Sequence, residues 1–247
     1  MKTNLNLFIN CAHRGASGHA PENTLAAMQK AIEMGAQMSE LDVQQTADDA
    51  LVLFHDDSLN RTSTGSGLLW QKTLDELQTL DAGSWYGEAF RDEPIPTLEQ
   101  VFELVRGKMK LNIEVKLHGH EREVAKLVVD KIKAANFADQ CIVTSFGHEV
   151  ADSIKALAPE LTVGYIFDHT QYSDAVFAGP VDLLSANYWL ITEDFMQKAR
   201  TAGKQVHVWT VNDKPTMRRM LEMGVDAVIT NYPDRLAEVV AEVKGQK

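Results

Sequence analysis

The chain has 247 residues, 45% of them hydrophobic, with 24 basic and 35 acidic side chains and a formal net charge of −11. This length allows one large buried core and is the usual size of an α/β barrel, so we expect a single domain over residues 1–247. No run of Lys and Arg marks a nucleic-acid surface, which argues against nucleic acid as a partner.

Short apolar runs alternate with amphipathic stretches along the chain, which indicates βα units and a parallel sheet. The predicted strands are Phe8–Ala12, Gln37–Val43, Leu111–Val115, Cys141–Thr144, Thr162–Phe167, Leu183–Ala186, Val206–Trp209 and Ala227–Ile229. Helix patterns include Thr24–Met34, Glu121–Ala135, Glu149–Leu157, Glu193–Ala202, Pro215–Met223 and Asp234–Val243. Eight strands with interleaved helices favour an α/β fold of the closed TIM (β/α)₈ barrel type over an open sheet.

Several predicted helices begin and end at residues that favour helix termini. Asn23 precedes the first helix and Thr192 precedes the helix at Glu193–Ala202, and both are good N-cap residues. Gly35, Gly203 and Gly224 follow predicted helices, where glycine tolerates the left-handed backbone.

One stretch interrupts this alternation after the second predicted strand. Residues Leu51–His55 predict an additional strand, and residues from about 56 to 96 are rich in turn formers, with a short helix near Thr73–Leu80. We interpret this stretch as a small insertion that packs beside the mouth of the barrel.

Three acidic residues form a candidate metal site. Glu40 and Asp42 stand two residues apart on one predicted strand and share a face, and Glu114 can join them from the adjacent strand of the barrel. Facing carboxylates repel one another unless a cation lies between them, and all-oxygen ligands favour Mg²⁺ or Ca²⁺. We therefore predict one divalent cation; the alternative is that some of these carboxylates only pair with Arg14 or Lys116.

Two histidines, His13 and His55, follow strand ends, where the site of such a barrel lies. Cleavage of a phosphodiester needs a base for the attacking hydroxyl and an acid for the departing alkoxide, and histidine titrates near neutral pH. We predict these two as the catalytic pair, with Asp56 orienting His55. Alternatively, each is a structural histidine with a local partner. The other six lack comparable neighbours, and we assign them to the surface, core or rim: His19, His118, His120, His148, His169 and His207.

Candidate substrate-binding residues lie beside these groups. An acidic protein that binds a phosphate ester needs local positive charge, and Arg14 and Lys116 provide it, because Arg can form two hydrogen bonds to phosphate oxygens. Both can also pair with the carboxylates. Trp209 ends a predicted strand and would offer a flat wall to a glycerol or alcohol group; packing in the core is its alternative role.

The remaining features concern location. No segment has the apolar length of a membrane span, and the N-terminus lacks the basic region and cleavage site of a secretory signal, so we expect a cytoplasmic protein without stable membrane association.

Cys11 and Cys141 lie in predicted buried strands, where a free thiol behaves as a small hydrophobe, and we expect no disulfide. The sequence does not indicate an oligomeric state.

These residues and their surroundings resemble the glycerophosphodiester phosphodiesterase family, in particular its bacterial cytosolic type. The segment His13-Arg14-Gly15-Ala16-Ser17-Gly18 carries part of the likeness. Further matching motifs cover residues 20–24, 40–43, 54–57, 59–65, 81–85, 95–98, 112–116, 208–212 and 224–226. The likeness spans nearly the whole chain, and ordered motifs at matching intervals are more specific than any single motif.

The resemblance implies a barrel with a small insertion after the second strand and a Mg²⁺- or Ca²⁺-dependent hydrolase. Such an enzyme releases glycerol 3-phosphate and an alcohol from deacylated phospholipids. The resemblance also assigns roles: His13 and His55 as the acid–base pair, Arg14 and Lys116 to phosphate, and the three acidic residues to the metal. Two departures are Asp48-Asp49-Ala50, where the family often has Asp-Gly, and Thr230-Asn231, where an aspartate is common.

Two rival functions remain open at this point. A phospholipase of the same barrel group would act on intact lipids, and it would need an exposed apolar or basic docking surface that the sequence does not present as a contiguous run. A catalytically silent module would only bind glycerophosphate-like ligands, and the complete set of ionisable residues argues against it. The sequence does not establish the head group, the cation, which histidine is the base, or whether water or a glycerol hydroxyl attacks.

Overall fold

In the computed structural model, which describes residues 7–245, eight parallel strands close into a barrel. These strands are β1 (Ile9–His13), β2 (Met38–Gln45), β4 (Lys110–Val115), β5 (Cys141–Ser145), β6 (Thr162–Phe167), β7 (Leu183–Asn187), β8 (Gln205–Trp209) and β9 (Ala227–Thr230). Strand β1 pairs with both β2 and β9, which closes the ring. The predicted TIM barrel and its eight strands are confirmed.

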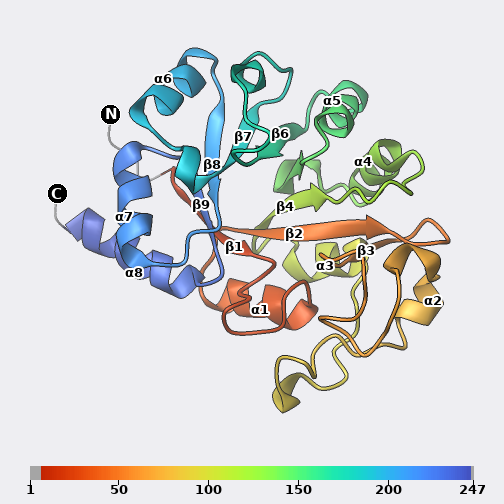
Figure 1. Ribbon diagram of the computed structural model, residues 1–247. Helices are drawn as coiled ribbons and strands as arrows, with labels where there is room; N and C mark the ends of the chain where they lie inside the picture. Colours follow the sequence, from red (N-terminus) through yellow and green to blue (C-terminus); the bar gives the residue numbers. More distant parts are fainter. Residues whose placement is uncertain (1–6, 246–247) are drawn as a thin grey trace.

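Helices connect most of these strands and lie outside them (Figure 1). They are α1 (Leu25–Glu33), α3 (Leu98–Val105), α4 (Val124–Ala134), α5 (His148–Leu157), α6 (Glu193–Thr201), α7 (Lys214–Met223) and α8 (Pro233–Gly245). Each packs an apolar face against the strands, as α3 does with Val101, Phe102 and Val105. The β6–β7 connection has only a 3₁₀ turn, Asp174–Phe177, whose Phe177 contacts the α6 residue Phe195.

Three helix predictions need correction. The first helix is capped by Thr24, whose hydroxyl accepts from the amide of Ala27, while Asn23 has a left-handed backbone and bonds to Asp42 instead. Helix α4 begins three residues later than predicted, because the Glu121 carboxylate accepts from the amides of the preceding loop. Helix α3 is absent from the predicted set, although Thr97 and Gln100 form a capping box at its start.

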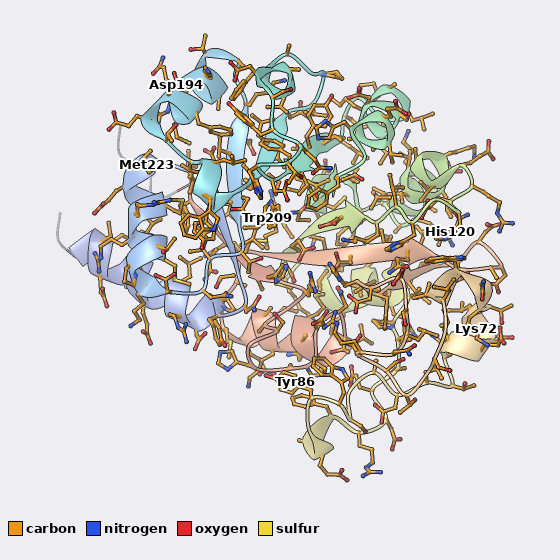
Figure 2. All side chains as sticks on the ribbon, viewed as in Figure 1. Lys72, Tyr86, His120, Asp194, Trp209 and Met223 are labelled. Carbon is orange, nitrogen blue, oxygen red and sulfur yellow. The ribbon has the colours of Figure 1, made fainter. Side chains whose placement is uncertain are left out.

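The insertion follows β2 and has a small core of its own. Strand β3 (Leu51–Leu53) pairs antiparallel with β2 and is shorter than the predicted Leu51–His55. The short helix α2 (Leu74–Leu77) is found where Thr73–Leu80 was predicted. Buried residues that hold the insertion together are Val52, Phe54, Leu59, Leu69, Leu77, Ala82 and Ile95. Figure 2 places its Tyr86 in the lower part of the view, away from Trp209 near the centre of the barrel.

Other sequence expectations concern termini, thiols and membranes. Both cysteines, Cys11 and Cys141, are free and buried. Within residues 7–245, no helix combines the length and the apolarity that a transmembrane segment requires. The ends of the predicted domain 1–247, namely residues 1–6 and 246–247, lie outside the described residues.

Candidate active site

The three predicted metal ligands converge in the structure. Glu40 and Asp42 lie on β2, Glu114 lies on β4, and the pairing of these strands sets Asp42 opposite Glu114. One carboxylate oxygen of each residue lies within 4.8 Å of the other two, and all three residues are buried. Because hard divalent cations prefer carboxylate oxygens, this cluster could hold one.

The charges of the cluster are only partly compensated by protein groups. Burial, with repulsion from Asp42 and Glu114, raises the pKa of Glu40 well above its usual value. Burial and the charge of Asp42 raise the pKa of Glu114 to about 7. Burial also disfavours ionised Asp42, but the nearby Arg14 and Lys116 outweigh it and lower the pKa of Asp42. Arg14 and Lys116 therefore favour the ionised form of Asp42, whereas Glu40 and Glu114 lack enough nearby positive charge.

The ion pairs considered as an alternative are also present. Arg14 Nε lies 3.1 Å from Asp42 Oδ2, and Lys116 Nζ lies 2.9 Å from Glu114 Oε1. Among the described residues, these pairs still leave Glu40 Oε1 and Asp42 Oδ1 buried without a hydrogen-bond partner. A buried polar atom without a partner costs free energy, so the donor set fits a cation that would take both oxygens.

The two predicted catalytic histidines reach the cluster from different segments. His13 ends β1, with Nδ1 2.7 Å from Asn231 Oδ1 and Nε2 3.9 Å from Glu40 Oε2. His55 follows β3, with Nδ1 2.6 Å from Asp56 Oδ1, the partner expected from the sequence. In both residues an oxygen fixes Nδ1, which leaves Nε2 for other contacts.

Burial disfavours the protonated form of both imidazoles. Burial, with the charge of Arg14, lowers the pKa of His13 to about 4. Burial also lowers the pKa of His55, although the charge of Asp42 acts in the opposite direction. A neutral imidazole has one free ring nitrogen, so each can accept a proton.

The turn after β1 positions Arg14. Arg14 and Gly15 both have left-handed backbones, with φ of 55° and 78°. A Cβ on Gly15 would lie 2.5 Å from Ala27 Cβ, so only glycine fits this turn. The Arg14 amide donates to Glu40 Oε2 at 3.0 Å, which ties the turn to the acidic cluster.

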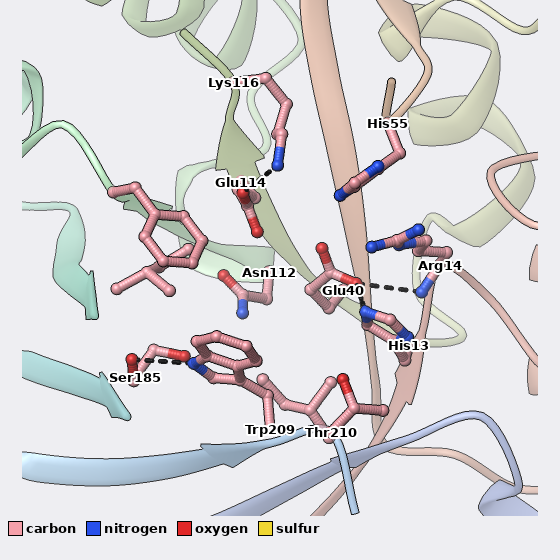
Figure 3. A pocket seen from close by; sticks show the side chains of 13 residues that line it. His13, Arg14, Glu40, His55, Asn112, Glu114, Lys116, Ser185, Trp209 and Thr210 are labelled. Carbon is pink, nitrogen blue, oxygen red and sulfur yellow. Dashed lines mark hydrogen bonds and ion pairs between the residues drawn. The ribbon is translucent and has the colours of Figure 1, made fainter. Parts of the chain in front are cut away.

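These groups surround one cavity of about 140 Å³ at the carboxyl ends of the strands, shown from close by in Figure 3. Its lining residues are His13, Arg14, Glu40, His55, Asn112, Glu114, Lys116, Phe146, Ile166, Ser185, Trp209, Thr210 and Ile229. One side is polar and charged, and the other is formed by Trp209, Phe146 and aliphatic side chains. Trp209 Nε1 donates to the Ser185 carbonyl at 3.0 Å, so the ring is held as a wall of the cavity. Asp42 lies behind the lining and contacts Arg14.

Several residues of the site were not predicted from the sequence. Asn231, noted there only as a departure from the family pattern, is the partner of His13, 218 residues away. Asn112 accepts from Thr144 at 2.8 Å and has an unpartnered amide nitrogen among the described residues. The Phe146 ring packs edge-on against Trp209, with centroids 5.6 Å apart. A strand-end position was the only available signal for Asn231 and Phe146, and nothing in the sequence shows which side chain each one meets.

Comparison with known proteins identifies the family. The model of the glycerophosphoryl diester phosphodiesterase family matches residues 13–235. A glycerophosphodiester phosphodiesterase from Caldanaerobacter subterraneus is 38% identical over 237 residues, which are 93% of this chain and 96% of that protein. A second, from Bacillus subtilis, is 32% identical over 94% of this chain and 86% of its own length.

A solved structure gives the same result. The Oleispira antarctica phosphodiesterase in complex with the product sn-glycerol-3-phosphate superposes with a TM-score of 0.87. It is 34% identical, and the match covers 94% of this chain and 96% of that one. With the barrel, the acidic cluster and these matches, the chain belongs to the glycerophosphoryl diester phosphodiesterase family and is an enzyme of that kind.

Proposed function

We propose that this enzyme hydrolyses a glycerophosphodiester to glycerol 3-phosphate and an alcohol, with His13 and His55 as an acid–base pair. One divalent cation, Mg²⁺ or Ca²⁺, would be held by Glu40, Asp42 and Glu114. The observation that carries the proposal is that both histidines line the same cavity as Glu40 and Glu114. When bound, the cation supplies positive charge that neutralises phosphoryl oxygens.

Arg14 and Lys116 would bind the phosphate. Both line the cavity, and both pair with carboxylates, Arg14 with Glu22 at 2.8 Å and Lys116 with Glu114 at 2.9 Å. These ties hold the cationic groups in place before the phosphate arrives, which reduces the cost of ordering them on binding. Trp209 would form the wall against the glycerol or alcohol portion of the substrate.

We assign His13 as the base and His55 as the acid. The nucleophile, either water or the neighbouring glycerol hydroxyl, would give its proton to His13 as its oxygen bonds to phosphorus. The bond from phosphorus to the alcohol oxygen would break as His55 delivers a proton to that oxygen. If the glycerol hydroxyl attacks, this step leaves a cyclic glycerol phosphate. Water would then open the ring, giving its proton to His55 while His13 returns a proton to the glycerol oxygen that leaves phosphorus. The partners support this assignment: Asp56 is a carboxylate that stabilises a protonated His55, whereas the amide of Asn231 adds no charge beside His13.

An assay of glycerol 3-phosphate release tests the proposal against its two rivals. We expect the enzyme to release glycerol 3-phosphate from glycerophosphocholine, to lose this activity with excess chelator, and to regain it when Mg²⁺ or Ca²⁺ is restored. A diacyl phospholipid should be a poor substrate, because the cavity of about 140 Å³ fits a small polar group. Faster turnover of the diacyl lipid would favour the phospholipase, and binding without any product would favour the silent module.

A cytoplasmic location, a single domain over residues 1–247 and the absence of nucleic-acid or stable membrane partners remain proposals from the sequence.

A further inference from the structure

Arg61, in the insertion, makes two separate forked contacts with carboxylates. Its Nε and Nη2 donate to Asp56 at 2.6 and 2.9 Å, and its Nη1 and Nη2 donate to Glu22 at 2.9 and 2.8 Å. Glu22 lies in the loop between β1 and α1, and 39 residues of sequence separate it from Arg61. The guanidinium therefore joins the insertion to the rim of the barrel.

The contacts of Arg61 lead directly to His55. Asp56 accepts from Arg61 through both oxygens, and its Oδ1 also contacts His55 Nδ1 at 2.6 Å. The hydrogen bonds that Arg61 donates are the main reason that the pKa of Asp56 lies far below its usual value. Asp56 is thus an ionised acceptor with a fixed orientation, and the imidazole that it holds has little freedom to rotate.

The two forks of Arg61 hold side chains that are less exposed than Arg61 itself. The Arg61 side chain is 45% exposed, whereas those of Glu22 and Asp56 are 14% and 26% exposed. Forked ion pairs in a network of this kind contribute to folding as well as to geometry. Arg61 lies outside the residues that line the cavity, so its effect on the reaction acts through the groups that it holds.

We propose that Arg61 is a positioning residue that fixes His55, through Asp56, for delivery of a proton to the departing alcohol. Glu22 holds the other side of the guanidinium and prevents Arg61 from following Asp56 outwards. This inference rests on the proposed role of His55 as the acid. A lysine could not replace the arginine fully, because an ammonium group does not form two planar forks.

The test compares two substrates that differ in their need for an acid. Glycerophosphocholine has an alkoxide leaving group that requires protonation, whereas the p-nitrophenyl ester of glycerol phosphate releases a stable phenolate. We expect Arg61→Ala to lower kcat on glycerophosphocholine by about 10- to 100-fold, the usual effect of losing an orienting partner. The loss on the p-nitrophenyl ester should be about tenfold smaller, and Arg61→Lys should fall between wild type and Arg61→Ala.

Arg91→Ala is the matched control. Arg91 also lies in the insertion and forms a fork with Glu88 at 2.7 and 2.6 Å, but this fork does not involve Asp56, so its loss should leave kcat unchanged. Urea unfolding of both alanine variants measures any loss of stability separately from the loss in kcat. Asp56→Asn tests the same contact between Asp56 and His55. The double variant should lose no more kcat than the more severe single variant, because Arg61 acts on His55 only through Asp56.

The possible failures are distinguishable. If His55→Ala is slow on glycerophosphocholine but Arg61→Ala keeps wild-type kcat, or loses the same factor on both substrates, Arg61 does not act through His55 and the inference is wrong. If the effects of Arg61→Ala and Asp56→Asn multiply fully, the inference is likewise overturned. If His55→Ala itself keeps near-normal kcat on glycerophosphocholine, the proposed function fails first.

Discussion

Replacing either His13 or His55 by alanine should lower kcat on glycerophosphocholine by about 10²- to 10⁴-fold, the usual contribution of general acid–base catalysis. The reason is geometric: each imidazole lines the cavity with Nδ1 fixed by an oxygen, and alanine removes the ring nitrogen that this contact positions for proton transfer. KM should change much less than kcat, because Arg14 and Lys116 remain to hold the phosphate. Steady-state kinetics at saturating metal would measure both parameters.

The two variants should differ on the p-nitrophenyl ester. His55→Ala should recover much of its activity there, since the leaving phenolate needs no proton, whereas His13→Ala should stay slow because its nucleophile still requires a base. His169→Ala is the matched control, as His169 is exposed in the β6–β7 connection. If both catalytic-site variants kept near-normal turnover on glycerophosphocholine, the acid–base scheme would be wrong.

A second large effect is expected from Glu40→Gln. The amide keeps the size of the side chain and an oxygen for the Arg14 amide, but it removes one charge from the metal ligands. A catalytic metal supplies several kcal/mol of transition-state stabilisation, and each 1.36 kcal/mol is tenfold in rate, so kcat/KM should fall by about 10³-fold. Isothermal titration calorimetry with Mg²⁺ or Ca²⁺ should show no measurable binding to the variant.

The same variant should affect stability in the opposite direction. Burial and the neighbouring carboxylates raise the pKa of Glu40 in the folded protein, which means that its ionised form is disfavoured there relative to the unfolded chain. Above the usual carboxyl pKa, a neutral amide removes this cost, so metal-free Glu40→Gln should be more stable than metal-free wild type. Added cation should stabilise wild type and leave the variant unchanged. Glu103→Gln, on an exposed residue of α3, is the control. Equal stabilisation of wild type and Glu40→Gln by the cation would contradict the assignment of Glu40 as a ligand.

The strands and the acidic cluster could be predicted because they depend on local periodicity. Side chains two residues apart on a strand share a face, and this alone sets Glu40 and Asp42 together. A parallel barrel then brings in Glu114 from the adjacent strand, as the register of Asp42 with Glu114 bears out. The contact between His55 and Asp56 was also accessible, since the residues are adjacent in sequence.

Contacts between distant segments could not be predicted in this way. The partner of His13 is Asn231, and the partner of Arg61 is Glu22; both pairs depend on how loops meet at the mouth of the barrel. The cap of α1 was misassigned for a related reason. Asn23 is a good capping residue in isolation, but its amide is taken by Asp42, so the neighbouring Thr24 caps the helix.

The position of the cation is the most direct test of the central claim that Glu40, Asp42 and Glu114 bind one metal beside the phosphate. Crystals grown with Mn²⁺ and glycerol 3-phosphate would locate the ion by its anomalous scattering. A single peak should lie about 2.0–2.6 Å from an oxygen of each residue, with the phosphate between Arg14 and Lys116. A peak elsewhere, with these three carboxylates paired only to Arg14 and Lys116, would contradict it.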